Sequence, residues 1–216
     1  MTTKILLLLG GVHHDFDGFA AAFDKIVGDA SHTITATYDG DTLLHLHENE
    51  VDVVALYTCL GGAQKDGVVA EDLPAEQTGA LVKWVRDGGG LLALHAATVM
   101  REGNQPLRGL IGARFLSHPP QFDFTVTPLA RSHPVTEGVG AFTVHDEFYM
   151  QDVSTDVTVH MTAEDRGAVH PMVWTKEAGH GRVVYLAPGH TASTWAEEDY
   201  QRLLRQSVNW LAGSLD

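Results

Sequence analysis

The sequence predicts an α/β protein built on a doubly wound, mostly parallel sheet. Three continuous apolar runs, at residues 4–11, 51–60 and 91–95, have the length and composition of strands that are buried on both faces. Two segments with apolar residues at helical spacing, 16–28 and 76–86, lie between them. Alternating strands and helices are typical of parallel sheets, because a parallel pair needs a crossover connection that is usually a helix.

The ends of these elements are marked by residues that interrupt regular structure. The run at 4–11 ends in two glycines, and the helical segment at 16–28 closes on a glycine. The next strand is expected at 32–38, where β-branched residues alternate with others. The helical segment at 76–86 follows a proline and precedes three glycines, which are start and stop signals of a helix.

The second half of the chain is richer in strand signals and ends in an amphipathic helix over 199–211. We expect its additional strands to be antiparallel and to lie at one edge of the sheet. No long linker, repeat or low-complexity tract divides the chain, so residues 1–216 are predicted to form a single domain. Strands are expected at 122–126, 142–144, 157–161, 172–174 and 182–186.

The charge balance excludes several classes of partner. The chain has 28 acidic residues against 14 Lys and Arg, a formal net charge of −14. Such a charge repels phosphate backbones and anionic membrane surfaces, so we expect neither a nucleic-acid nor a membrane partner. No apolar run approaches the roughly 20 residues of a membrane span, and the N-terminal run is too short for a signal peptide. A cytoplasmic location is therefore expected, and the single cysteine excludes an internal disulfide.

Histidine is unusually frequent, with 13 residues, and several histidines follow predicted strands. His13 and His14 come after the first strand, His95 ends the third, and His190 follows a late strand. Ligands of open α/β sheets bind outside the carboxyl ends of the strands, so these imidazoles are expected to converge there. The alternative is that each histidine caps a helix or fills a loop.

Two further segments offer polar side chains. His118 lies in a Ser-His-Pro turn, where the following proline holds it in extended geometry. On a strand, Glu147 and Tyr149 would face one side while Asp146 and Phe148 face the other. An acid that points into a cleft serves as a general base or a metal ligand. The alternative is a solvated edge strand.

Covalent acyl chemistry is disfavoured. The tight turn after the third strand resembles a nucleophile elbow, but His95 stands where Ser or Cys would be needed. Thr98 lies three residues too far along the chain. Cys59 ends a different strand and is interpreted as a buried structural residue.

The sequence assigns no cofactor. The histidines and Glu147 are ligand types that suit Zn, Mn or Fe. However, the chain contains no HExxH motif and no fixed ligand spacing, so a divalent metal is left open as an alternative.

Seven short motifs in this order span nearly the whole chain and together resemble the ThuA-like (trehalose utilisation) family. The resemblance implies a three-layer, flavodoxin-like fold similar to class I glutamine amidotransferases, in which the elbow lacks the nucleophilic cysteine. It also implies a link to the catabolism of trehalose and related sugars, including 3-keto-glycosides. The motifs are HD (14–15), GGGLLALHAAT (88–98), GARFLSHP (112–119), SHP (132–134), DEFY (146–149), HPMVW (170–174) and GRVVYLAPGHT (181–191).

From the residues and the resemblance together, we expect an enzyme of sugar catabolism that acts on trehalose-type disaccharides or 3-keto-glycosides by acid–base chemistry of His and Glu. The alternative is a non-catalytic carbohydrate-binding or accessory protein on a degenerate amidotransferase-like fold. A small-molecule sugar is the expected partner, and a homo-oligomer is left open. The candidate catalytic residues are His95, Glu147, His118 and His14, and the candidate substrate-binding residues are His13, Asp146, Tyr149, His190 and Thr98.

Overall fold

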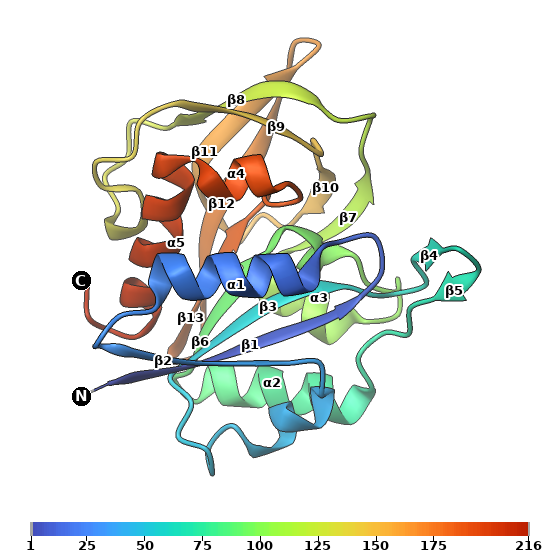
Figure 1. The fold of residues 1–216 in the computed structure, drawn as a ribbon, viewed down its shortest axis with the longest axis vertical. Coiled ribbons are helices and arrows are strands. Elements are labelled where there is room, and N and C mark those ends of the chain that lie inside the picture. Colours follow the sequence, from blue (N-terminus) through green and yellow to red (C-terminus); the bar gives the residue numbers. More distant parts are fainter. Residues whose placement is uncertain (1, 216) are drawn as a thin grey trace.

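A nine-stranded sheet runs through the computed structural model, which describes residues 2–215 (Figure 1). In chain order the helices and strands are β1 (Thr3–Gly11), α1 (Phe16–Val27), β2 (His32–Thr37), β3 (Val53–Cys59), β4 (Gln64–Lys65), β5 (Val68–Val69), α2 (Ala75–Arg86), β6 (Gly90–Leu94), α3 (Gln105–Ile111), β7 (Ala113–Ser117), β8 (Phe122–Pro128), β9 (Phe142–Asp146), β10 (Met150–Val153), β11 (Thr158–Asp165), β12 (Ala168–Ala178), β13 (Gly181–Leu186), α4 (Ala192–Ala196) and α5 (Glu198–Leu211). The strand order of the large sheet is β2-β1-β3-β6-β13-β12-β11-β8-β9, and β7–β10 and β4–β5 form two small sheets. Among the described residues, no helix is long and apolar enough to cross a membrane.

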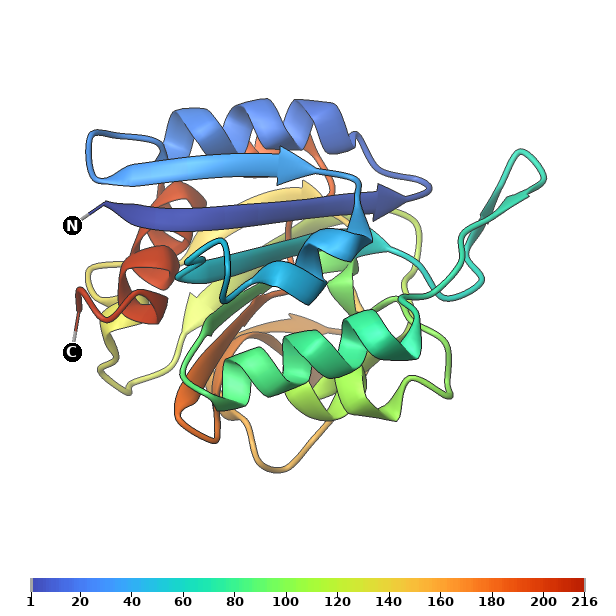
Figure 2. The same ribbon diagram turned by 90° about the horizontal axis from the view of Figure 1, so that it is seen from below.

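The first five strands of this order, β2 to β13, are parallel to one another. Strands β3 and β6 are buried along their whole length, because helices cover both faces of the sheet. Figure 2 shows α1 and α5 over one face and α2 and α3 over the other. Since every side chain of these strands faces a packed layer, the sequence has continuous apolar runs there. The predicted doubly wound α/β fold is confirmed, with β1, β3 and β6 as neighbours.

The remaining strands form an antiparallel extension at one side of the sheet, as predicted. β12 pairs with β13, and β11, β8 and β9 follow in antiparallel order. Along β9, buried and exposed residues alternate, so one face of this strand packs on the core. The strand ends at Asp146, so the next residue, Glu147, lies just beyond the end of β9.

Several short elements are absent from the sequence-based prediction, and one predicted arrangement is wrong. The helix α3 begins where the Asn104 side chain accepts a hydrogen bond from the Leu107 backbone N–H at 3.2 Å, a local cap that hydrophobic periodicity does not reveal. The segment expected to be a strand over residues 146–149 is not one, because β9 ends at Asp146. Asp146 and Tyr149 are both buried, whereas Glu147 is partly exposed.

His160 makes the stability of the fold sensitive to pH. The ring is fully buried, its Nε2 lies 2.8 Å from the Thr175 hydroxyl oxygen, and it packs on the ring of His133. Burial, with the nearby His133 and Arg131, lowers the pKa of His160 from 6.5 to about 4. Between pH 6.5 and about 4, this histidine is therefore protonated in the unfolded chain but neutral in the folded protein.

We expect the free energy of unfolding to fall as the pH is lowered from about 6.5 to about 4. Denaturant titrations across this range should show the loss in the wild type and a smaller loss in His160→Gln, whose amide does not titrate. Parallel stability curves for the two proteins would contradict this assignment.

Candidate active site

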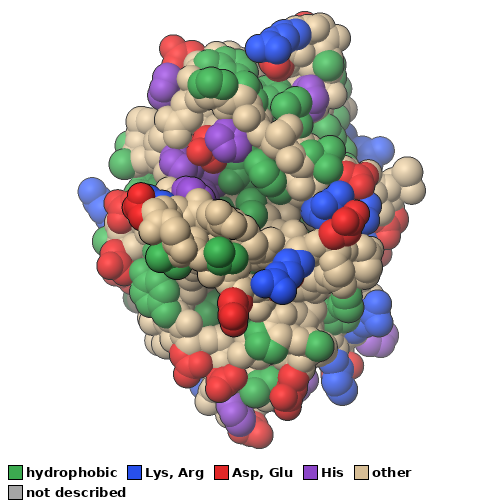
Figure 3. Space-filling model, turned by 90° about the vertical axis from the view of Figure 1, so that its right-hand side faces the viewer, with side chains coloured by type: hydrophobic (Ala, Val, Ile, Leu, Met, Phe, Trp, Pro, Cys, Tyr) green, Lys and Arg blue, Asp and Glu red, His purple; other side chains and the backbone are tan. Residues whose placement is uncertain are grey.

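Polar and titratable side chains surround a cavity of about 490 Å³ at the carboxyl ends of the parallel strands. This volume is within the range of small-molecule sites, about 300–1,000 Å³. Figure 3 shows histidine side chains close together beside an acidic one on this face of the molecule. A larger surface hollow, of about 660 Å³ near Pro74 and Arg101, is lined by no histidine. The smaller cavity is lined by His13, His14, Cys59, Ala63, Val99, Phe115, His118, Glu147, Tyr149 and His190.

The turn between β1 and α1 brings His14 to the cavity. Gly11 has a φ of 103°, and a Cβ there would lie 1.9 Å from the carbonyl oxygen of Cys59, so the turn needs glycine. His14 Nδ1 lies 3.0 Å from the Val12 carbonyl oxygen. Since a carbonyl only accepts, Nδ1 carries the hydrogen and Nε2 keeps its lone pair. Burial, and then the proximity of His95, lowers the pKa of His14 to about 3, so its ring is neutral at neutral pH.

His95 occupies the first position after β6, at the sharp turn. Its φ of 40° is unusual for a residue with a side chain, and such strain persists where the surroundings impose it. The Tyr185 hydroxyl donates to the His95 carbonyl oxygen at 2.8 Å. His95 Nδ1 donates to the Ala187 carbonyl oxygen at 2.6 Å, so in the neutral ring the lone pair lies on Nε2. The elbow position therefore presents a fixed, fully buried imidazole.

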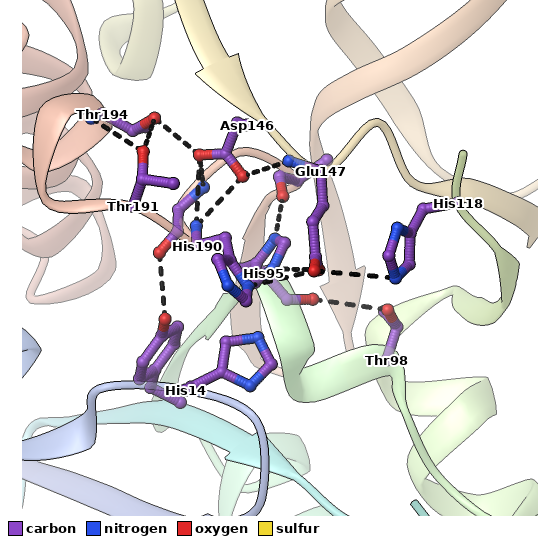
Figure 4. A network of polar contacts seen from close by, with 12 residues as sticks. His14, His95, Thr98, His118, Asp146, Glu147, His190, Thr191 and Thr194 are labelled. Carbon is purple, nitrogen blue, oxygen red and sulfur yellow. Dashed lines mark hydrogen bonds and ion pairs between the residues drawn. The ribbon is translucent and has the colours of Figure 1, made fainter. Parts of the chain in front are cut away.

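A buried carboxylate, Asp146, joins the two segments that carry Glu147 and His190 (Figure 4). The network fixes both backbone segments at the edge of the cavity, because a charged acceptor forms stronger hydrogen bonds than a neutral one. Asp146 accepts from four donors: the backbone N–H groups of Glu147 at 2.7 Å, Gly189 at 3.0 Å and His190 at 3.1 Å, and the Thr194 hydroxyl at 2.5 Å.

Glu147 lies at the centre of the site, with imidazoles around its carboxylate (Figure 4). Its Oε2 is 3.2 Å from His190 Nδ1 and 3.4 Å from His95 Nε2. Its Oε1 is 3.6 Å from His118 Nε2. Burial opposes the ionisation of Glu147, but the contacts with His190 and His95 outweigh it and hold the pKa well below its usual value. Glu147 is therefore an anion that can bind a cation, and it is a weaker base than an ordinary carboxylate.

Two aromatic side chains and His118 also line the cavity. The His118 side chain is 34% exposed, and its Nδ1 donates to the Pro119 carbonyl oxygen at 2.8 Å. The Tyr149 ring packs between His95 and Phe115, with centroid distances of 4.1 and 4.5 Å. Burial raises the pKa of Tyr149 well above its usual value, so the hydroxyl keeps its proton.

The structure brings together seven of the nine candidate residues. Four of them each place one donor atom within 4.8 Å of the others, an arrangement that can hold a metal ion. We call these four the His–Glu cluster; they are His14, His95, Glu147 and His190. The other three that it brings to the site are His13, His118 and Tyr149.

Three candidates, His95, Asp146 and Thr98, are fully buried and do not line the cavity, although His95 belongs to the His–Glu cluster beside it. Asp146, predicted to bind substrate, is fully buried, and its carboxylate accepts hydrogen bonds from protein donors. Thr98, also predicted to bind substrate, is fully buried, with its hydroxyl oxygen 3.3 Å from that of Tyr185. One question left by the sequence is answered. Of the paired histidines, His14 enters the cluster and His13 stays exposed at the rim.

Sequence reasoning missed the apolar part of the lining. Phe115 belongs to the same motif as His118, and this proximity was the available signal. Ala63 and Val99 are apolar loop residues with no distinguishing pattern. Cys59 lines the cavity as well, but burial raises the pKa of its thiol to about 12, which keeps it protonated and a weak nucleophile.

A family model described as ThuA, trehalose utilisation, matches residues 4–211. The chain belongs to the ThuA family. None of the curated proteins compared with this ThuA chain matches it.

Solved structures share the fold of this ThuA chain at low sequence identity. A ThuA-like protein from Parabacteroides merdae is 18% identical with a TM-score of 0.81, and the match covers 99% of this chain and 91% of that one. A ThuA-like protein from Bacteroides uniformis is 17% identical with a TM-score of 0.75, covering 97% and 91%. A protein of Salmonella typhimurium LT2 described as cytoplasmic is 12% identical with a TM-score of 0.70, covering 97% and 99%. The flavodoxin-like fold implied by the family resemblance is confirmed.

Proposed function

We propose that this ThuA chain is a cytoplasmic enzyme of sugar catabolism that acts on trehalose-type disaccharides or 3-keto-glycosides in the cavity beside Glu147. The description of the family as trehalose utilisation supports a sugar substrate. The net charge of −14 supports a neutral small molecule as the partner and disfavours nucleic acids and anionic membranes.

The observation that carries the proposal is the environment of Glu147. Its side chain is only 12% exposed, and three imidazoles lie within 3.6 Å of its oxygens. A site that merely holds a sugar needs hydrogen-bonding groups and an apolar surface, but it does not need a desolvated anion surrounded by histidines. Titratable groups that perturb one another in a cavity are typical of sites that carry out chemistry.

Different residues of the cavity are suited to contacting the sugar and to transferring a proton. Phe115 offers an apolar face to a sugar ring, and Tyr149 closes the wall behind it. His118 is the imidazole at the open side of Glu147, so it is placed to exchange a proton with a bound sugar. Proton transfer beside a carbonyl, or elimination or hydrolysis of an oxidised glycoside, fits these groups.

A substrate screen tests the proposal. Trehalose, other disaccharides and their 3-keto derivatives would be incubated with the purified full chain, with and without Zn²⁺, Mn²⁺ or Fe²⁺, and products followed by NMR. We expect turnover of at least one oxidised or unoxidised disaccharide. Saturable sugar binding with no turnover under any condition would overturn the proposal in favour of a carbohydrate-binding protein.

His118→Ala is expected to lower turnover by about 10²-fold, because it removes a positioned proton-transfer group. The fold should be unaffected, since this side chain is partly exposed. Steady-state kinetics on the substrate found by the screen would measure the loss, with His45→Gln as a control at an exposed histidine paired with Glu48. Equal kcat values for the two variants would contradict the role given to His118.

A further inference from the structure

Three buried imidazole nitrogens in the His–Glu cluster form no well-aligned hydrogen bond within the described part of the chain, although two of them lie 3.2 and 3.4 Å from Glu147 Oε2. They are Nε2 of His14, Nε2 of His95 and Nδ1 of His190. The three rings lie 4.6–5.6 Å apart, measured between centroids. Buried polar atoms in folded proteins are almost always paired, so three atoms without a well-aligned bond in one place indicate a partner that the polypeptide itself does not supply.

The lone pairs of two of these rings are aimed by the backbone. Val12 and Ala187 accept from the Nδ1–H groups of His14 and His95 through their carbonyl oxygens. Each ring is thereby fixed in the tautomer that leaves Nε2 free to donate an electron pair. A second ring nitrogen held by a backbone carbonyl is the usual arrangement of histidines that ligate metals.

We propose that the four residues of the His–Glu cluster bind one divalent transition-metal ion. Their donor atoms lie within 4.8 Å of one another. Four donors arranged tetrahedrally at about 2.0–2.2 Å from a shared ion lie about 3.3–3.6 Å apart, so side-chain rotations that move the outer donors about 1 Å inward would complete the shell. Three imidazoles and one carboxylate suit Zn²⁺, Mn²⁺ or Fe²⁺, whereas Mg²⁺ and Ca²⁺ take oxygen ligands.

A metal ion bound by the cluster would also be accessible to a substrate in the cavity. Three of its members, His14, Glu147 and His190, line the cavity, so a bound ion would face the space where a sugar would enter. An ion there would polarise a carbonyl oxygen or a bound water molecule. Glu147 then acts as a ligand, and His118, outside the cluster, remains for proton transfer. The inference rests on the proposed function only for the substrate, because metal binding is measured without turnover.

Metal binding to the purified full chain tests the inference. The protein would be stripped with EDTA, exchanged into metal-free buffer and titrated calorimetrically with Zn²⁺, Mn²⁺ and, without oxygen, Fe²⁺. We expect one ion bound per chain for at least one of these metals, and a higher melting temperature in its presence. Co²⁺ would report nitrogen and oxygen ligation through its visible absorption bands.

Matched variants show whether the cluster is the site. Glu147→Gln and His190→Gln should each raise the dissociation constant by at least about 10-fold, whereas His45→Gln and His118→Ala should bind as the wild type does. Circular dichroism would establish that each variant is folded. Absence of stoichiometric binding by the wild type, or unchanged affinity in both folded cluster variants, would overturn the metal site. Stoichiometric binding without turnover of any sugar would support the metal site and count against the proposed function alone.

Discussion

Turnover of the sugar substrate is expected to fall by at least about 10³-fold when Glu147 is replaced by glutamine. Glutamine has nearly the same size, but it lacks the negative charge that three imidazoles face. It neither accepts a proton nor neutralises a bound cation, so both routes to catalysis at this position are lost. Steady-state kinetics on the substrate identified by the screen would measure the effect.

The fold should survive this change, because the Glu147 backbone N–H still donates to Asp146. We therefore expect the melting temperature of the variant to stay within a few degrees of that of the wild type, both measured in EDTA. His45→Gln, at an exposed position, should leave turnover unchanged. Activity of Glu147→Gln within a few-fold of the wild type would rule out a central role for this carboxylate.

Asp146→Asn should have the largest effect on stability, lowering the free energy of unfolding by on the order of 3 kcal/mol. The buried carboxylate accepts from the backbone N–H groups of Gly189 and His190 and from the Thr194 hydroxyl. An asparagine has one acceptor oxygen, so its NH₂ group would be turned toward donors that are buried and then unpaired. The segment that carries His190 would lose its anchor, and metal affinity should fall with stability.

Denaturant unfolding in EDTA measures the loss without a contribution from bound metal. Asp123→Asn is the matched control, because that carboxylate is 75% exposed and pairs with His145 at the surface. Its loss should be below about 1 kcal/mol. Equal stabilities for the two variants would show that the Asp146 network contributes little.

Local pattern was sufficient to predict the parallel half of the sheet. The apolar run that becomes β3 is buried on both faces, as expected of a central strand of a parallel sheet. The short elements were missed for a physical reason. Helix α3 depends on the Asn104 cap and on Gly112 in the left-handed conformation at its end, which are single contacts rather than a periodic pattern.

The sequence predicted those residues of the candidate site that directly follow parallel strands. His14, His95 and His190 follow β1, β6 and β13, and the carboxyl ends of parallel strands meet at one edge. The place of Glu147 was not predictable in this way, because it follows an antiparallel edge strand whose end point is set by pairing with β8. The strand alternation assumed for Asp146 placed it on the opposite side from Glu147. It gave no sign of the donors from Gly189, His190 and Thr194, which lie more than 40 residues later in the chain.

The sequence by itself determined the class of fold, the order of its strands and helices along the chain, and the set of histidines available at the sheet edge. These follow from periodicity and from glycine and proline signals, which act over a few residues. Only the tertiary structure decided that His14 and not His13 enters the cluster, that the buried Asp146 carboxylate joins two backbone segments, and that three imidazoles surround one carboxylate. The reason is that backbone carbonyls distant in sequence, such as that of Ala187 against His95, fix the orientation of each ring, and such contacts exist only once the sheet has assembled.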